Sequence, residues 1–437
     1  MRRAVGAAGL LAVMLGACGG SALQRAADRG DFAAVKSSVA ARQRAGDLGN
    51  GEAAGLAKSV AAWEITKAPK EEQLARVRDV RACAPELDDA LSDRMKTHDP
   101  AGAEAALARV EAGEMSLGAA RDHLGDADDA WRAVGARGLV REEDQAARAK
   151  AYLDPAPGVR RAALHAALVA KDGRDVEPLA EVARVDPEPI ARTDAVRALG
   201  AIGGAEVVGK LRDVWTSADE PLREDIAGAW AAPPSWSAGG REELRVLVAA
   251  GHGPGAIEAA GAALRGGTRD PEIDDSARAL LARTVREGSD RDRLHAIAFL
   301  PRAEGALLDA LRLVAKDAGF TVRVAALARL AELDSDRRAS IAALEAIAGP
   351  ASPPTPASAR AKLALAAAGD TRVQSWIEAD LVAPESSTRL SAATALAALG
   401  RSGRAAPLLA DADSAVRTRA ACALILATRG TSPARLH

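Results

Sequence analysis

The sequence contains six histidines, the residue type that most often binds transition metals and moves protons near neutral pH. They are scattered, none belongs to an HExxH motif, and none is followed by a glutamate. Walker A loops, dinucleotide fingerprints and the G-x-S-x-G turn are also absent from the sequence. The sequence therefore predicts no catalytic residue, no metal site and no cofactor, and we interpret the histidines as surface or hydrogen-bonded core residues. They are His98, His123, His165, His252, His295 and His437.

Neighbouring carboxylates occur at Asp88-Asp89, Asp128-Asp129 and Asp274-Asp275, and such pairs can act as a general acid and base. Each pair lies near the start of a predicted helix. Negative side chains at a helix N-terminus cap free backbone N–H groups and favour the helix dipole. We therefore interpret these pairs as helix caps.

Three tryptophans, Trp215, Trp230 and Trp236, lie close together in a chain in which aromatic residues make up only 2%. Tryptophans are frequent at the centres of protein interfaces, so this cluster could form a partner-binding surface. The alternative, which we favour, is that the three side chains fill the space where two helices separate around Pro233-Pro234.

The first residues have the layout of a secretory signal, with Arg2 and Arg3 followed by an uncharged apolar stretch that is too short to span a membrane. The run that ends at Cys18, Leu15-Gly16-Ala17-Cys18, resembles the lipobox of bacterial lipoproteins. The resemblance implies that residues 1–17 are removed and that Cys18 is lipidated. Gly19 stands where an aspartate would favour the inner membrane. We therefore expect an outer-membrane anchor and a chain that faces the periplasm, with the cell surface as an alternative.

The other two cysteines, Cys83 and Cys422, show no metal-binding spacing and lie 339 residues apart in the sequence. An elongated molecule would keep its two ends separated, and a disulfide needs Cα atoms within about 7 Å of each other. We therefore expect both to be buried free thiols, with a disulfide in an oxidising compartment as the less favoured alternative.

An internal repeat is the strongest pattern in the sequence. An aspartate followed six residues later by an arginine, and then by an alanine-rich amphipathic run, occurs five times. The pairs are Asp126 with Arg132, Asp154 with Arg160, Asp186 with Arg192, Asp317 with Arg323, and Asp411 with Arg417. Related runs without the aspartate bring the repeat positions to ten, separated by 28 to 37 residues; at one of them, Glu258 replaces the arginine. The positions are 132, 160, 192, 223, 258, 293, 323, 360, 389 and 417.

Each repeat position opens a run with apolar residues at i, i+3, i+4 and i+7, which is one face of a helix. A second, shorter helix is predicted between successive positions, as in 176–184, 209–215, 242–250 and 273–286. A helix pair buries its apolar face only by stacking on further pairs, so the sequence predicts an all-α chain folded as a right-handed α-solenoid of about ten helix pairs.

These repeats resemble the HEAT-repeat family, in particular the short HEAT-like repeats of phycobilin lyases, over residues 115–430. The resemblance implies that each aspartate pairs with an arginine of the adjacent repeat, forming an inner ladder of ion pairs. Between Arg223 and Arg293 the aspartate is missing. We expect the ladder to be interrupted there, at a point where the superhelix could bend or bind something.

Residues 18–114 are predicted to be an irregular helical region that caps the array, and residues 431–437 a tail. The stretch 23–36 is similar to the helix-turn-helix of a single ankyrin repeat. A plain helical hairpin explains this stretch equally well, because the end repeats of solenoids are atypical.

A formal net charge of −2 argues against nucleic-acid binding, which requires an excess of basic residues. The pattern favours a non-enzymatic, monomeric scaffold that binds unknown proteins on its concave face and reaches the membrane through Cys18. The alternative, implied by the resemblance to the lyases, is an enzyme or accessory factor that acts on a partner protein.

Overall fold

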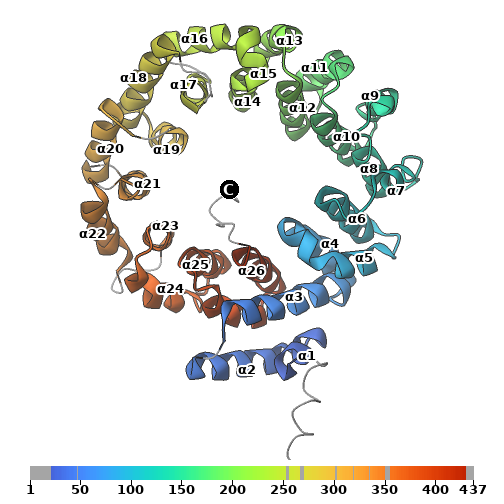
Figure 1. Ribbon diagram of the computed structural model, residues 1–437, viewed down its shortest axis with the longest axis vertical. Helices are drawn as coiled ribbons and strands as arrows, with labels where there is room; N and C mark the ends of the chain where they lie inside the picture. The colour runs from blue at the N-terminus through green and yellow to red at the C-terminus, as the bar shows by residue number, and fades with distance from the viewer. Residues whose placement is uncertain are drawn as a thin grey trace, which may run out of the picture. The chain divides into compact units, whose positions relative to one another are not determined.

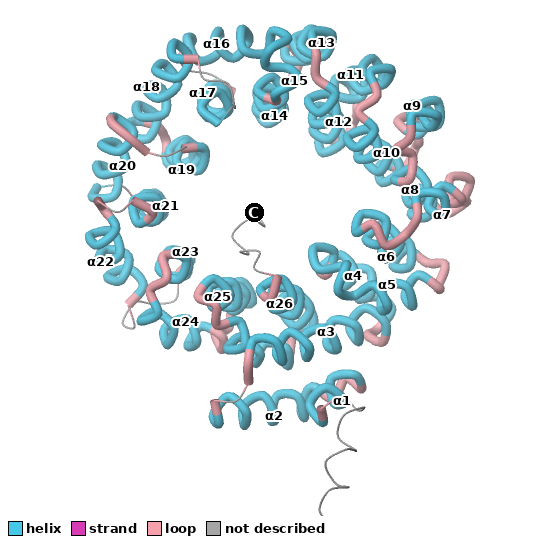
Figure 2. The backbone as a smooth tube through the Cα atoms, viewed as in Figure 1, coloured by secondary structure: helices cyan, strands magenta, loops and turns pink. Residues whose placement is uncertain are grey.

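The protein is described by a computed structural model that covers residues 21–46, 48–251, 255–265, 270–300, 303–317, 319–333, 335–349 and 355–429. These residues form helices joined by short loops, and no strand occurs among them (Figure 2). None of these helices combines the length and the apolar character that a membrane span needs. The predicted all-α solenoid is confirmed for this part of the chain. The predicted signal peptide, Cys18 and tail lie outside the described residues.

The helices belong to two compact units. Unit 1 combines residues 1–90 with residues 377–437, and unit 2 comprises residues 91–376. The predicted division at residue 115 follows the sequence repeat, whereas the two units follow spatial contacts. The structure therefore groups the last predicted repeats with the N-terminal region.

Unit 2 is built from two curved layers of helices, an inner layer and an outer layer (Figure 1). Helices of one layer alternate along the chain with helices of the other, as expected for stacked helix pairs. The inner layer contains α6 (Pro100–Ala112), α8 (Asp129–Arg137), α10 (Pro157–Ala170), α12 (Pro189–Ile202), α14 (Glu220–Ala231), α17 (Ala256–Arg265), α19 (Asp290–Phe299), α21 (Phe320–Ala331) and α23 (Pro356–Ala367). The outer layer contains α7 (Leu117–Arg121), α9 (Gln145–Ala151), α11 (Val176–Val185), α13 (Ala205–Trp215), α16 (Arg241–Ala250), α18 (Pro271–Glu287), α20 (Ala306–Asp317) and α22 (Arg337–Ala348).

Local sequence explains where the inner helices begin and end, and α12 is an example. Pro189 occupies the first turn, where its missing N–H costs nothing. Ala191, Ala195 and Leu199 form a fully buried stripe. The helix ends at Gly203, whose φ of 68° suits a residue without a side chain. Small buried residues of this kind let neighbouring helices pack closely, so the core is spread along the array.

Unit 1 brings the two ends of the described chain together. From the N-terminal side it contains α1 (Ala22–Asp28), α2 (Phe32–Ala45), α3 (Asn50–Thr66), α4 (Lys70–Asp79) and the 3-10 helix η1 (Arg81–Leu87). From the C-terminal side it contains α25 (Ser386–Ala398), the 3-10 helix η6 (Ser402–Ala410) and α26 (Ser414–Ala427). Helices α5 (Asp88–Met95) and α24 (Gln374–Asp380) lie at the boundaries between the units. Helix α26 packs along α3, as the blue and dark red helices in Figure 1 show.

Cys83 of η1 and Cys422 of α26 form a disulfide, with their Cα atoms 5.6 Å apart. The expectation of two free thiols is therefore wrong. It assumed that residues distant in sequence stay distant in space, but the C-terminal helix of unit 1 packs directly against the N-terminal helices. Both cysteines are nearly inaccessible to solvent, so the bond lies in the core of unit 1.

Candidate functional site

The inner layer carries the ion-pair ladder that the repeat predicts, and Arg160 of α10 shows its geometry. Its Nε and Nη2 donate to the Asp186 carboxylate at 2.7 and 2.9 Å, and its Nη1 donates to the Asp154 backbone carbonyl at 3.0 Å. Each arginine can thus fix the loop of its own repeat and hold the aspartate of the next. Charge-assisted, bidentate hydrogen bonds of this kind fix both the distance between the two side chains and their relative orientation.

The same link joins Arg132 to Asp154 at 3.3 Å, Arg192 to Asp219 at 2.9 Å and Arg389 to Asp411 at 2.8 Å. Asp126, the first predicted aspartate, instead lies 3.2 Å from the Nε2 atom of His98. The Asp317 side chain lies outside the described part of the structure, so the predicted role of Asp317 and Arg323 stays a prediction.

The last arginine, Arg417 of α26, pairs with a residue that the repeat does not include. Its Nε donates to the Glu64 carboxylate of α3 at 2.5 Å, and its Nη1 donates to the Asp411 carbonyl at 2.7 Å. Its guanidinium also lies over the ring of Phe32, 4.2 Å from the centroid. Unit 1 therefore extends the ladder from the C-terminal repeat to an N-terminal helix.

The ladder changes at α14. Arg223 donates to the Trp215 carbonyl at 3.2 Å and lies over the Trp215 ring. Trp215 packs against Trp230, with ring centroids 5.3 Å apart. Trp230 and Trp236 are buried, 2% and 6% exposed, which matches the space-filling interpretation. Partner binding through these three tryptophans stays a prediction.

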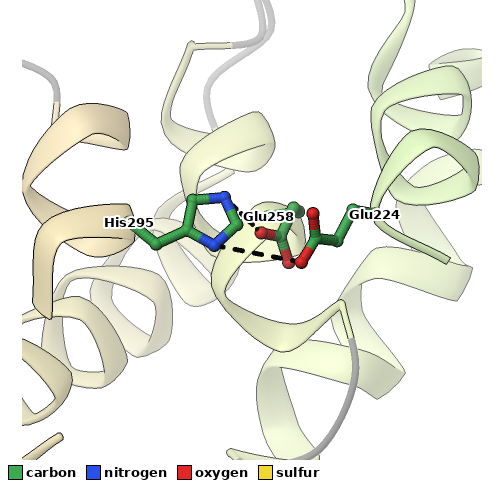
Figure 3. A group of neighbouring side chains, drawn as sticks. All are labelled: Glu224, Glu258 and His295. Atoms are coloured by element: carbon green, nitrogen blue, oxygen red, sulfur yellow. Dashed lines mark ion pairs between the residues drawn. The ribbon is translucent and has the colours of Figure 1, made fainter. Parts of the chain in front are cut away.

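Where the ladder is interrupted, the inner layer brings together Glu224 of α14, Glu258 of α17 and His295 of α19 (Figure 3). The Nε2 atom of His295 lies 2.7 Å from Oε1 of Glu258, and its Nδ1 lies 3.9 Å from Oε1 of Glu224. Glu258 is 6% exposed, whereas the other two side chains are about one quarter exposed. The side chains of these three residues, which belong to three successive helices of the inner layer, thus converge on one point.

Electrostatic interactions within this cluster shift two pKa values. The contact with Glu258 raises the pKa of His295, since a nearby carboxylate favours the protonated imidazole. Burial raises the pKa of Glu224, and the negative charge of Glu258 raises it further. The cluster can therefore act either as an ion pair or as a set of ligands for a cation.

Two cavities of about 610 and 570 Å³ adjoin at this cluster, because Glu224 and Glu258 line both. Small residues from α12, α14 and α17, including Gly200, Gly228 and Ala262, line the first cavity. The second opens toward α18 and the start of α19. We call this pair of cavities the inner groove.

The sequence located the interruption of the ladder but not the cluster within it. Glu258 was recognised only as a substitution for arginine, and His295 was interpreted as an isolated residue. The three residues are separated by 34 and 37 positions, which is close to the repeat length. They do not align within the repeat, because they lie one, zero and two residues after the repeat positions 223, 258 and 293. Which of them meet therefore depends on how the three helices are oriented.

Comparisons with known proteins concern the helical arrangement alone. No protein-family model and no curated protein matches the sequence. Among solved structures, Kap121p aligns with 88% of this chain and 46% of its own, at 12% identity and a TM-score of 0.24. A mutant of Kap121p aligns over the same shares, at 13% identity and a TM-score of 0.25. The chain thus spans about half the length of these structures.

Proposed function

We propose that this protein is a non-enzymatic scaffold that binds a segment of a partner protein in the inner groove. The observation that carries the proposal is the position of the groove. Its two cavities meet where the regular ladder gives way to the Glu224, Glu258 and His295 cluster. At Arg132, Arg160 and Arg192 the ladder arginine pairs with an aspartate of the next repeat, whereas the charged groups of the cluster line open cavities.

The lining of the groove indicates what kind of segment it accepts. Its small residues allow an extended backbone to approach the helices closely. In the first cavity Arg265 lies over the ring of Phe299, 4.4 Å from the centroid, and burial lowers the pKa of its guanidinium. Glu224 and Asp225, which also line this cavity, supply negative charge. A partner segment with an acidic group toward Arg265 and a basic group toward the two carboxylates complements this surface.

We further propose that Cys18 anchors the chain by lipid in the outer membrane, facing the periplasm. Two observations support this location. The sequence before Cys18 resembles a lipobox, and the disulfide between Cys83 and Cys422 is typical of proteins in an oxidising compartment. Two or more acyl chains on one cysteine would give stable anchoring.

Crosslinking and affinity capture from the native host test both proposals. The groove variant is Gly228→Phe, because a side chain built at Gly228 meets nothing within 4 Å and would project into the groove. The matched control is Gly209→Phe on the outer helix α13, where a side chain also meets open space. We expect the wild type and the control to capture a defined partner, and Gly228→Phe to lose it. In direct binding measurements, the purified partner should bind the wild type and the control equally and Gly228→Phe more weakly.

Equal binding by Gly228→Phe and the wild type would show that the groove is not the binding surface. Mass spectrometry of the N-terminal peptide tests the proposed lipid anchor separately. A lipidated Cys18 is expected, and an unmodified chain that still begins at Met1 would contradict the anchor.

A further inference from the structure

We propose that Glu224, Glu258 and His295 bind a divalent transition-metal ion. Each residue offers one ligand atom, and these atoms lie within 4.8 Å of one another. Two carboxylate oxygens and one imidazole nitrogen are ligands that zinc and its first-row neighbours accept. The three side chains come from three successive helices and converge on one point (Figure 3).

The separations between the ligand atoms fit such an ion after small side-chain rotations. Bonds of about 2.0–2.2 Å from zinc to nitrogen and oxygen place neighbouring ligand atoms about 3.3–3.6 Å apart in a tetrahedron. The three ligand atoms, one from each residue, lie within 4.8 Å of one another. His295 contacts Glu258 through Nε2 and Glu224 through Nδ1, and only one of these nitrogens can bind the ion, so one carboxylate must turn toward the nitrogen that does.

Glu258 is the most buried residue of the cluster. Its side chain is more than nine-tenths buried, and its Oε1 atom lacks a hydrogen bond among the described residues. This oxygen lies 2.7 Å from the Nε2 atom of His295, with which Glu258 forms an ion pair. A buried carboxylate oxygen without a hydrogen bond is costly. A cation facing Glu258, either the protonated imidazole of His295 or a bound metal ion, offsets that cost.

The surroundings favour a cation as well. Five carboxylates and two guanidiniums line the second cavity, so its charge is negative when His295 is neutral. The carboxylates are Glu220, Glu224, Glu258, Glu287 and Asp292, and the guanidiniums are those of Arg283 and Arg291. Arg283 donates to the Gly251 carbonyl at 2.5 Å, and Arg291 lies 3.9 Å from Glu220. Arg283 is thus engaged by a backbone carbonyl, and Arg291 by one of the five carboxylates of the same cavity.

With three protein ligands, a tetrahedral ion keeps one position open, and the adjoining cavity leaves room for water or a partner's group there. The ion would link α14, α17 and α19 in the part of the array where the ladder is interrupted. This inference goes beyond the proposed scaffold role. Metal binding by the purified chain and partner capture are separate measurements, so either can fail without the other.

The test is isothermal titration of the purified, chelator-treated chain with Zn²⁺, at a pH near 8 so that zinc competes little with protons for the imidazole. The test variants are His295→Ala and Glu258→Gln. The matched control is His165→Ala, because His165 also lies on an inner helix and pairs with a buried aspartate, Asp194, at 3.2 Å. We expect one site in the wild type and the control, and binding weaker by at least about tenfold in both test variants.

Substitution with Co²⁺ gives a second readout that does not depend on stability. The wild type is expected to develop visible absorption bands that His295→Ala lacks, while circular dichroism shows both proteins to be folded. The proposal is overturned if the wild type binds no more zinc than His295→Ala, or if His165→Ala removes the site instead. Preference for Mg²⁺ or Ca²⁺ over Zn²⁺ would also contradict the proposed class of ion.

Discussion

Buried arginine side chains link neighbouring helices of this protein, and the most buried of them is Arg148 of α9. It is fully inaccessible to solvent, and its Nε donates to Asp175 at 2.8 Å while its Nη2 donates to Asp172 at 3.1 Å. Its Nη1 donates to the carbonyls of Leu139 and Arg141. One side chain therefore joins three parts of the outer layer.

Arg148→Ala is predicted to lower the free energy of unfolding by about 3–5 kcal/mol, because it leaves buried carboxylates without their cation. The control is Arg184→Ala, which breaks the exposed pair with Glu181 and is expected to cost about 1 kcal/mol or less. Urea unfolding followed by circular dichroism measures both. Similar losses for the two variants would contradict this account of Arg148.

The lowered pKa of the neighbouring Asp172 predicts that the stability of the protein depends on pH. Hydrogen bonds from Arg174 hold the pKa of Asp172 at about 2, below its ordinary value of 3.8. Because the pKa is lowered by folding, the charged carboxylate stabilises the folded state above about pH 4, and this contribution disappears as the pH falls toward 2.

Asp172→Asn is therefore expected to cost about 1–2 kcal/mol near neutral pH and progressively less in acid. Unfolding free energies of the wild type and the variant, compared at several pH values, measure this trend. A difference that stays constant down to pH 2.5 would show that the Asp172 charge contributes nothing.

Individual residues differed in how well the sequence predicted them. The ladder pairs of Arg132, Arg160 and Arg417 follow from a repeated spacing, although Arg417 meets Glu64 rather than an aspartate. His295 could not be placed, because its partners lie on other helices and the orientation of each helix decides whether they meet. Spacing within one helix is fixed by its geometry, but spacing between helices depends on packing.

At the scale of the elements, the spacing between α17 and α19 decides the geometry of the candidate site. Gly261 of α17 faces Phe299 of α19, and a Cβ atom added at Gly261 would lie 2.7 Å from the Phe299 Cβ. That is closer than two carbon atoms approach without displacement. The absence of a side chain at Gly261 is therefore what allows Glu258 and His295 to meet.

Gly261→Ala is predicted to push the two helices apart, to cost about 1–3 kcal/mol of stability and to weaken zinc binding. Gly209→Ala in α13 is the control, because its added methyl group meets open space and removes a flexible residue from a helix. It is expected to be neutral or slightly stabilising. Thermal melts and zinc titrations of both variants measure these effects, and unchanged zinc affinity in Gly261→Ala would disprove the link.

The sequence predicted the elements well and their grouping poorly. The second helices expected at 176–184 and 273–286 correspond to α11 and α18, which are longer by only a few residues. Amphipathic periodicity and caps determine such local features. The pairing of α26 with α3 has no local signal, since it depends on contacts between residues more than 340 positions apart.

At the scale of the whole molecule, the disulfide between Cys83 and Cys422 joins segments 339 residues apart in sequence within unit 1. Cys422→Ser is predicted to lower the stability of unit 1 by about 2–5 kcal/mol, because a crosslink restricts the unfolded chain. Reduction of the wild type should have the same effect on its melting curve.

Alkylation under denaturing conditions, followed by peptide mass spectrometry, tests the bond directly. Cys83 and Cys422 should react only after reduction. Labelling of both cysteines without reductant would show that they are free thiols, as the sequence predicts.

The central claim is that a partner binds in the inner groove, and photo-crosslinking from defined positions tests it most directly. A photoreactive residue is placed at Arg197, which lines the groove, or at Arg212 on the outer helix α13; the two side chains are equally exposed, at 61% and 60%. The account predicts that the captured partner crosslinks to position 197 and not to position 212. Crosslinking at position 212 alone, or equally at both positions, would contradict it.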